Sequence, residues 1–340
     1  MISPLADGTA TSAATILAVG NHDITRAHMD TPGDWRVESI RLSARPNTLA
    51  ADPRNDGIVY AGTQGAGIYR SSDYGETWKL LGLDGQIVKS IAVSPHDPAV
   101  IYAGVKPAGL FRSHDGGRTW RELDGFRRIP NRWWWFSPAE PPFRAYVNAL
   151  ATSPTEPDVV LAGIEFGAVV RSDDGGRTWT GHRPGAIRDC HSLSFHVANG
   201  LWAYEAGGTG GGAAVSRDGG LKWEQSRSGL AKHYGVACAA DPEQPEVWYV
   251  SISSGPGKAY GASAEAYLYR VSGGASWQPI GWQDHPMDQM PLVLATVPGS
   301  PGHLYAGTTK GRIWHSDDYG DSWRGLPFVV DSSISDMLLL

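Results

Sequence analysis

Residues 172–179 read SDDGGRTW, and four close copies of this phrase recur along the chain. The copies are SSDYGETW at 71–78, SHDGGRTW at 113–120, SRDGGLKW at 216–223 and SDDYGDSW at 316–323. Two weaker echoes are RVSGGASW at 270–277 and MDTPGDW at 29–35. A phrase that recurs at a regular interval indicates a repeat architecture, in which each copy belongs to one supersecondary unit.

The interval between copies predicts the size of that unit. The tryptophans that end the seven phrases are mostly about 43 residues apart, a typical length for a propeller blade; they are Trp35, Trp78, Trp120, Trp179, Trp223, Trp277 and Trp323. A second phrase precedes several of them, as in SIAVSPHDPAVIYAG (90–104) and NALATSPTEPDVVLAG (148–163). Each unit reads as four short strands of alternating polarity, separated by Pro- and Gly-rich turns. The sequence therefore predicts an all-β fold, a seven-bladed β-propeller with four-stranded antiparallel blades.

The two ends of the chain predict how the ring closes. SISDMLLL at 333–340 has the pattern of an innermost strand, whereas TILAVG at 15–20 resembles a second strand. We expect the C-terminal strand to pair into the N-terminal blade. Residues 1–340 then form a single domain, with insertions at 121–146 and 252–267 on the expected site face.

The phrase S-x-D-x-G-x-T-W is similar to the Asp-box, or bacterial neuraminidase repeat. The chain resembles the Asp-box propeller superfamily, which includes sialidases, two-propeller xyloglucanases, sortilin-type receptors and a photosystem II assembly factor. The second phrase is closest in style to the xyloglucanase and assembly-factor types. The resemblance implies the fold, while its members include enzymes, receptors and assembly factors, so it leaves the function open.

Composition excludes several classes of protein. Of the 340 residues, 41% are hydrophobic and the formal net charge is −6, so we expect a folded chain that does not bind nucleic acid. Two cysteines cannot make a disulfide framework and fit a reducing compartment. The first twenty residues have no Lys or Arg and only a short apolar run, unlike a signal peptide or a membrane span. We expect a cytoplasmic protein without a membrane partner.

The acidic residues of the repeated phrase are expected to be structural. An Asp in a turn accepts hydrogen bonds from nearby backbone N–H groups. We assign this role to Asp73, Asp115, Asp174, Asp218 and Asp318. Their turns should lie on the face opposite the functional site.

The expected site lies where two sets of loops meet, those before the first strand and those between the second and third strands of each blade. Polar groups that converge on a concave surface are the usual signature of a site. The catalytic candidates are acids and histidines able to transfer protons: Glu165, Glu205, Asp288, His191 and His233. The alternative for each histidine is that it lines the channel and forms hydrogen bonds without a catalytic role. The substrate-binding candidates in the same loops are Lys89, Lys106, Asn148, Arg188 and Tyr234.

The first insertion adds a second group of binding candidates. It places Arg128 and Arg144 near Trp133 and Trp134. Aromatic rings stack on sugars and guanidinium groups bind carboxylates, so this segment is one candidate wall for an anionic or carbohydrate ligand. The alternative is that the tryptophans pack against neighbouring blades or form an oligomer contact.

Two functional hypotheses follow. The first is a carbohydrate-active or small-metabolite enzyme, glycosidase-like or, as the second choice, lyase-like, that acts on a small-molecule or oligosaccharide ligand in the central pocket. The second is a non-catalytic propeller that binds a protein or peptide partner. No H-x-x-x-H or Cys/His spacing is present, so the expectation is no metal site and no cofactor. The oligomeric state stays open.

Overall fold

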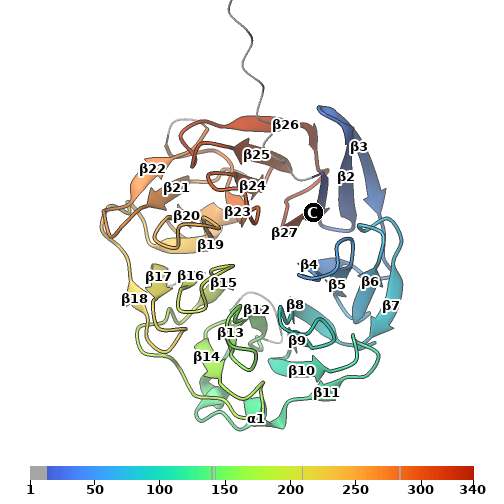
Figure 1. Ribbon diagram of the computed structural model, residues 1–340. Coiled ribbons are helices and arrows are strands. Elements are labelled where there is room, and N and C mark those ends of the chain that lie inside the picture. The colour runs from blue at the N-terminus through green and yellow to red at the C-terminus, as the bar shows by residue number, and fades with distance from the viewer. Residues whose placement is uncertain (1–13, 139–140, 142, 209, 283–284) are drawn as a thin grey trace, which may run out of the picture.

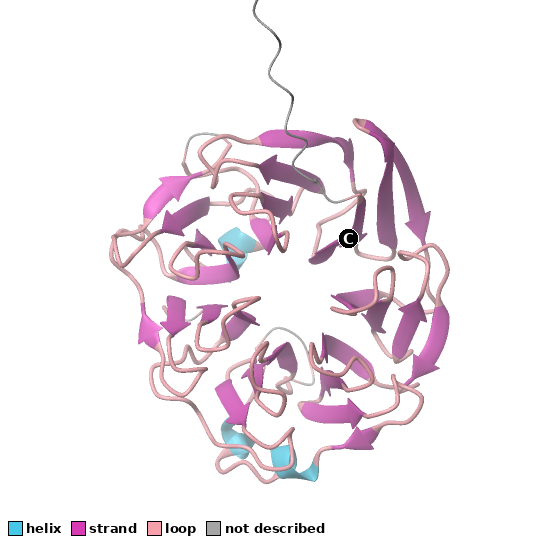
Figure 2. Ribbon diagram, viewed as in Figure 1, coloured by secondary structure: helices cyan, strands magenta, loops and turns pink. Residues whose placement is uncertain are grey.

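Seven antiparallel sheets stand around a central axis like the blades of a propeller (Figure 1). This computed structural model describes residues 14–138, 141, 143–208, 210–282 and 285–340. Strands and loops make up nearly all of the ring (Figure 2); the described helices are short, α1 (Asp124–Arg127), the 3-10 turn η1 (Arg132–Trp134) and α2 (Pro256–Ala259). Within the described residues, no helix has the length and apolarity to cross a membrane. The all-β propeller predicted from the repeats is confirmed.

The blades follow one another in chain order, and in each blade the strands run from the centre of the ring outward. Blade 1 comprises β27 (Asp336–Leu339), β1 (Thr15–Val19), β2 (Ile24–Thr31) and β3 (Asp34–Ile40). Blade 2 comprises β4 (Pro46–Ala51), β5 (Val59–Thr63), β6 (Ile68–Ser71) and β7 (Lys79–Gly82). Blade 3 comprises β8 (Ile87–Val93), β9 (Ile101–Lys106), β10 (Gly109–Ser113) and β11 (Arg121–Glu122). Blade 4 comprises β12 (Val147–Thr152), β13 (Val160–Ile164) and β14 (Ala168–Ser172).

The last three blades have the same antiparallel order. Blade 5 comprises β15 (Cys190–Phe195), β16 (Ala203–Gly207), β17 (Gly212–Ser216) and β18 (Glu224–Gln225). Blade 6 comprises β19 (Tyr234–Ala240), β20 (Trp248–Ser253), β21 (Ala266–Val271) and β22 (Gln278–Ile280). Blade 7 comprises β23 (Pro291–Thr296), β24 (Leu304–Thr308), β25 (Arg312–Ser316) and β26 (Arg324–Val329).

Blade 4 departs from the expected four strands. After Trp179 the described chain pairs with β14 through an isolated bridge between Thr180 and Arg171 and a hydrogen bond from Arg183 N to Val169 O, and no fourth strand forms there. Gly181 and Pro184 follow within five residues. Glycine weakens a strand and proline cannot donate to its ladder, which explains why this outer strand is lost.

Ring closure follows the prediction. β27 pairs antiparallel with β1, with Leu338 opposite Leu17, so both ends of the chain share blade 1. The Asp336 carboxylate extends the closure to blade 2, because its Oδ2 accepts hydrogen bonds from Leu49 N at 2.8 Å and Thr48 Oγ1 at 3.0 Å.

The core of the ring lies between neighbouring blades, and the glycine of the Y/L-A-G phrase sets their spacing. A Cβ on Gly104 would lie 2.6 Å from the Val147 side chain of blade 4, and one on Gly163 would lie 2.4 Å from Cys190 Sγ of blade 5. Both distances are shorter than real carbon contacts allow. Glycine is therefore required at these two positions, where a second strand passes the first strand of the next blade.

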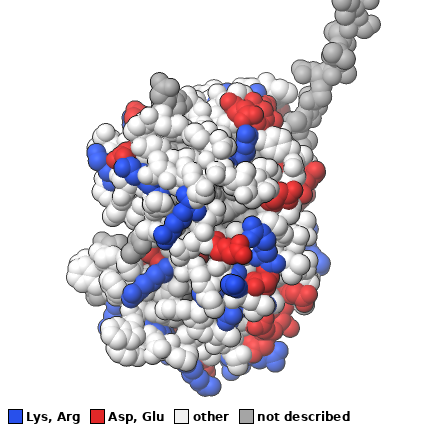
Figure 3. Space-filling view, turned by 90° about the vertical axis from the view of Figure 1, so that its left-hand side faces the viewer, with Lys and Arg blue, Asp and Glu red and all other residues white. Residues whose placement is uncertain are grey.

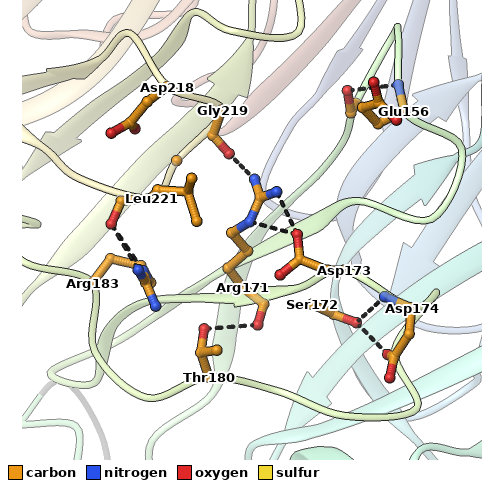
Figure 4. Close-up of polar contacts among 12 residues, drawn as sticks. Glu156, Arg171, Ser172, Asp173, Asp174, Thr180, Arg183, Asp218, Gly219 and Leu221 are labelled. Carbon is orange, nitrogen blue, oxygen red and sulfur yellow. Dashed lines mark hydrogen bonds and ion pairs between the residues drawn. The ribbon is translucent and has the colours of Figure 1, made fainter.

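The Asp-box turn is held by its own side chains (Figure 4). In blade 4, Ser172 Oγ donates to Asp174 Oδ1 at 2.9 Å and accepts from Gly176 N at 2.8 Å. Asp174 Oδ1 also accepts from Thr178 N at 2.8 Å. The Ser and Asp contacts recur in the other four boxes. These bonds agree with the structural role expected for the Asp residues.

An arginine before the box joins each of several blades to the next one. Arg171 donates to the carbonyl oxygen of Gly219, which lies in the Asp-box turn of blade 5 (Figure 4). The same carbonyl position of the following box accepts from an arginine at three other interfaces; these pairs are Arg26 with Tyr74, Arg112 with Gly175, and Arg270 with Tyr319. The repeat thus encodes both a turn and an inter-blade contact.

Candidate functional site

A cavity of about 930 Å³ opens between blades 4, 5 and 6. Its walls come from the segments before the first strands and from the loops after the second strands, on the face opposite the Asp-boxes. From blades 4 and 5 these are Tyr146, Glu165, Phe166, Asp189, His191 and Gly210. From blade 6 and the loop before it they are Ala231, Lys232, His233, Tyr234, Ser254, Gly255, Pro256 and Tyr260. Pro138, from the first insertion, also lines the cavity.

A β-bulge in each of several first strands aims one side chain at the next blade. The pairing of β15 with β16 shifts register between Cys190 and Ser192, which leaves His191 as the extra residue. The same shift leaves Asn47, Lys89 and Asn148 as the extra residues of their strands. Bulges re-aim side chains and are frequent beside active sites.

Asn148 and His191 use this position to bond across blades. Asn148 Nδ2 donates to the carbonyl oxygens of Cys190 at 3.2 Å and His191 at 3.0 Å. His191 Nδ1 lies 2.7 Å from the carbonyl oxygen of Gly235 in blade 6. A carbonyl only accepts, so Nδ1 carries a proton and the opposite ring nitrogen, Nε2, faces the cavity cluster. Asn148 thereby positions the backbone that carries His191.

Glu165, Asp189 and His191 form a compact cluster on the cavity wall. One carboxylate oxygen of each acid and one imidazole nitrogen all lie within 4.8 Å of one another. Asp189 Oδ1 is 3.4 Å from His191 Nε2. The acids are only 6% and 3% exposed, so this cluster combines two buried carboxyl groups with one oriented imidazole.

The surroundings move the pKa values of this cluster. Burial, followed by the negative charge of Asp189, raises the pKa of the Glu165 carboxyl. Burial opposes the charged form of His191, but the hydrogen bond and charge of Asp189, with Gly235 and Glu165, outweigh it and raise the pKa of His191. Each group therefore depends electrostatically on its neighbours.

Three tyrosines surround the cluster. Tyr146 is hydrogen-bonded to Glu165, and burial together with this carboxylate raises the pKa of Tyr146. The hydroxyls of Tyr234 and Tyr260 are hydrogen-bonded to each other. The Tyr234 ring also lies 5.1 Å from the His191 ring, centroid to centroid. The cavity therefore presents aromatic faces beside the polar cluster.

Two predicted lysines flank the Tyr146 ring. Lys89 Nζ is 5.4 Å and Lys106 Nζ is 5.6 Å from its centroid, within the range of cation–π contacts. Lys232, on the cavity wall, pairs with Glu265 at 3.5 Å. Lys89 and Lys106 therefore place positive charge beside the tyrosine that is hydrogen-bonded to Glu165.

The structure separates Glu205 from the other candidates. Its side chain is fully buried inside β16, outside the cavity lining, and its Oε2 accepts from Ile187 N at 2.9 Å. Burial raises the pKa of Glu205 to about 8. It lies at the interface of blades 4 and 5 rather than at the cavity.

Asp288 and Arg188 also lie outside the cavity lining. Asp288 forms an exposed ion pair with Lys310, and Arg188 faces a separate hollow shared with Trp134 and His182. Trp133 and Arg144 line another small hollow, and Arg128 lies in one beside the Asp-box turn of blade 4. Of the predicted residues, those that line the cavity are Glu165, His191, His233 and Tyr234.

Asp189 lines the cavity although its sequence pattern did not mark it as catalytic. It lies two residues before His191, directly before β15. The usable signal was the pair of polar residues around Cys190 at the start of a first strand. The bulge at His191, which brings both side chains to one side, has no signature in the sequence.

The comparisons with known proteins agree with this architecture. A family model described as BNR-Asp box repeat matches residues 68–81, which cover β6 and the first full box. No curated protein matches the chain in sequence.

Solved structures match most of the ring. A GH74 xyloglucanase from Xanthomonas campestris is 20% identical, covering 93% of this chain and 46% of its own, with a TM-score of 0.62. YCF48 from Cyanidioschyzon merolae is 14% identical, covering 86% and 88%, with a TM-score of 0.59. YCF48 bound to a D1 peptide is 15% identical, covering 83% and 82%, with a TM-score of 0.57.

These likenesses concern the fold. This chain spans less than half the length of the xyloglucanase. The repeated boxes, the family match and the ring of seven sheets agree on one class. The chain is a seven-bladed β-propeller whose blades carry turns similar to the Asp-box repeat.

Proposed function

We propose that the protein is an enzyme that hydrolyses a small carbohydrate or a related polar metabolite in the cavity between blades 4, 5 and 6. The observation that carries this proposal is the convergence of Glu165, Asp189 and His191 on one wall. Burying two carboxyl groups beside an imidazole costs folding free energy, and such costs are concentrated at functional sites. Hydrolysis needs groups that bind water and transfer protons, and these three side chains provide them.

The lining supports a sugar-like substrate. Tyr234, Tyr260 and Phe166 offer aromatic faces for the apolar side of a sugar ring, while the cluster offers acceptors for its hydroxyl groups. A volume of about 930 Å³ accommodates a ligand the size of a short oligosaccharide. The outer surface of blades 5 and 6 has acidic and basic side chains interspersed (Figure 3), which does not favour a polyanion such as nucleic acid.

The test is a turnover screen of the purified chain on aryl glycosides, uronate-containing oligosaccharides and sialosides, following reducing ends and the absorbance of unsaturated products. We expect reducing ends to be released, and Glu165→Gln and Asp189→Asn to lower kcat/KM at least 100-fold. Glu205→Gln is the matched control, because this carboxyl group is buried outside the cavity and should leave turnover unchanged. If unsaturated products appear instead, the reaction is an elimination and the proposal of hydrolysis is wrong.

A second candidate function is the binding of a protein partner. It is favoured by the exposed aromatic side chains of the first insertion, since Trp133, Trp134 and Phe143 are 72%, 59% and 56% exposed. Exposed aromatic patches are typical of interaction surfaces. No turnover across the whole panel would favour this candidate.

A further inference from the structure

We propose that Glu165, Asp189 and His191 bind one divalent cation of the Mn²⁺ or Zn²⁺ type at the wall of the cavity. This inference rests on the proposed function only for its role in hydrolysis; the binding site itself stands on geometry. It departs from the expectation of no metal, which considered ligand spacing along the sequence and not donors from two blades.

The first argument is distance. The three ligand atoms lie within 4.8 Å of one another, and Asp189 Oδ1 and His191 Nε2 are 3.4 Å apart. Two ligands of a tetrahedral ion with bonds of about 2.1 Å are separated by roughly 3.4 Å. These two atoms therefore already have the spacing of a coordination edge. The third ligand atom, on the longer Glu165 side chain, lies within 4.8 Å of the other two and has to move closer to complete the set.

The second argument is the orientation of the imidazole. Metal-binding histidines generally donate their other ring N–H to a carbonyl or a carboxylate, which fixes the ring. His191 Nδ1 makes this contact with the Gly235 carbonyl oxygen at 2.7 Å. Its Nε2 therefore points toward the two carboxylates, as a metal ligand would. The bulge at His191 and the Gly235 carbonyl of the adjoining blade hold this orientation.

The third argument concerns charge and the surrounding contacts. Two carboxyl groups, 6% and 3% exposed, lie close together, and a divalent cation would offset both charges. Tyr146 is hydrogen-bonded to Glu165, and Ser137 Oγ donates to Glu165 Oε1 at 3.5 Å. Such outer contacts orient metal ligands. Lys232 and His233 also line this cavity, outside the three-residue cluster, and Lys89 and Lys106 flank the Tyr146 ring.

The donor types favour particular ions. Imidazole suits Zn²⁺ and related transition metals, whereas carboxylates suit Mn²⁺ and Mg²⁺. One imidazole with two carboxylates therefore favours an ion that accepts both ligand types, such as Mn²⁺ or Zn²⁺. Three protein ligands leave a position open toward the cavity, as in catalytic sites. There a bound cation would orient substrate hydroxyl groups or lower the pKa of a water molecule.

The test measures Mn²⁺ binding to the full chain without substrate. After treatment with EDTA and dialysis, the protein is titrated with Mn²⁺, and free Mn²⁺ is followed by electron paramagnetic resonance and total heat by calorimetry. We expect one site per chain, with Zn²⁺ competing for it. Asp189→Asn, Glu165→Gln and His191→Gln should each weaken binding at least tenfold, whereas Glu205→Gln should bind like the wild type.

Several outcomes separate this proposal from the proposed function. No binding at millimolar Mn²⁺, or binding that all three variants retain, overturns the metal site, even if the chain hydrolyses a glycoside. Binding lost in the variants but with no turnover on any substrate supports the site and removes the hydrolase. Thermal unfolding of each variant identifies misfolded protein, and nitrogen coupling in the Mn²⁺ spectrum that disappears in His191→Gln tests the imidazole ligand directly.

Discussion

Arg112 Nη1 donates a 2.6 Å hydrogen bond to the carbonyl oxygen of Gly175, which belongs to the Asp-box turn of the next blade. The Arg112 guanidinium also lies 5.2 Å from the centroid of the Tyr102 ring. Arg112 directly precedes the Asp-box of blade 3, and its partner lies in the Asp-box of blade 4. This contact therefore joins one repeat to the next around the ring.

Removing this contact should weaken the ring. We expect Arg112→Met to lower the free energy of unfolding by about 1–3 kcal/mol, since it removes a charge-assisted hydrogen bond while keeping most of the apolar stem. Urea denaturation measures the loss. The control is Arg118→Met, at an exposed position of the box turn in blade 3. Equal stability of the two variants would mean that the inter-blade bond contributes nothing.

The Asp-box carboxylate should matter for stability and not for chemistry. Asp174→Ala removes acceptors for Ser172 Oγ, Thr178 N and Thr178 Oγ1 and should cost about 1–2 kcal/mol of unfolding free energy. Thermal unfolding and Mn²⁺ titration, done on the same preparation, separate the two properties. Asp56→Ala, at an exposed loop, is the control. A loss of Mn²⁺ binding at unchanged stability would contradict the structural role.

The architecture could be predicted from the repeated phrases because each unit contains the residues of its own turn and of its close contact with the next blade. The Asp-box forms its turn from residues within eight positions, and the glycine of the Y/L-A-G phrase is required by the next blade. Ring closure by residues 333–340 followed for the same reason, since the first blade lacked an innermost strand. The missing fourth strand of blade 4 depends on Gly181 and Pro184, which lie outside the repeated phrases.

Candidate residues were harder to predict because strand register decides them. Glu165 directly follows β13 and reaches the cavity, whereas Glu205 lies within β16, opposite Leu193, and is enclosed between blades. The two glutamates looked alike in sequence, since each follows a second strand's apolar run. A displacement of a few residues along a second strand moves a carboxyl group from the cavity to the core.

Tyr260 should control substrate binding if the cavity is the site of hydrolysis. It lies at the end of the second insertion's helix, on the cavity wall, and exposes 55% of its surface. Tyr260→Ala should raise KM about tenfold with little change in kcat, because it removes an aromatic face and leaves the cluster intact. Tyr260→Phe keeps that face and should retain KM. Wild-type KM in both variants would place the substrate elsewhere.

Acid should weaken the fold through His315. This residue occupies the arginine position before the last box; burial, followed by the charges of Arg324 and His303, lowers its pKa to about 4. As the pH falls below about 6.5, the unfolded chain binds a proton that the folded His315 refuses, so stability declines until about pH 4.

The measurement is urea denaturation of wild type and His315→Gln at pH 7 and pH 5. We expect the variant to lose less stability between these pH values than the wild type, by on the order of 1 kcal/mol. His22→Gln, at an exposed position, is the control and should follow the wild type. Parallel pH dependence of wild type and His315→Gln would exclude this histidine as the sensitive group.

Asp336 should be the critical side chain of ring closure. It lies in β27 and accepts hydrogen bonds from Leu49 N and Thr48 Oγ1 of blade 2, and from its own neighbour Met337 N at 2.8 Å. Asp336→Ala leaves these donors without their acceptor, which should cost about 2–3 kcal/mol of unfolding free energy. Hydrogen exchange should accelerate first in β1 and β27, because the pairing of these strands joins the two ends of the chain. The control is Asp331→Ala, at an exposed position of the preceding loop, which should leave both measurements unchanged. Equal exchange rates in the two variants would show that backbone pairing closes the ring without the Asp336 side chain.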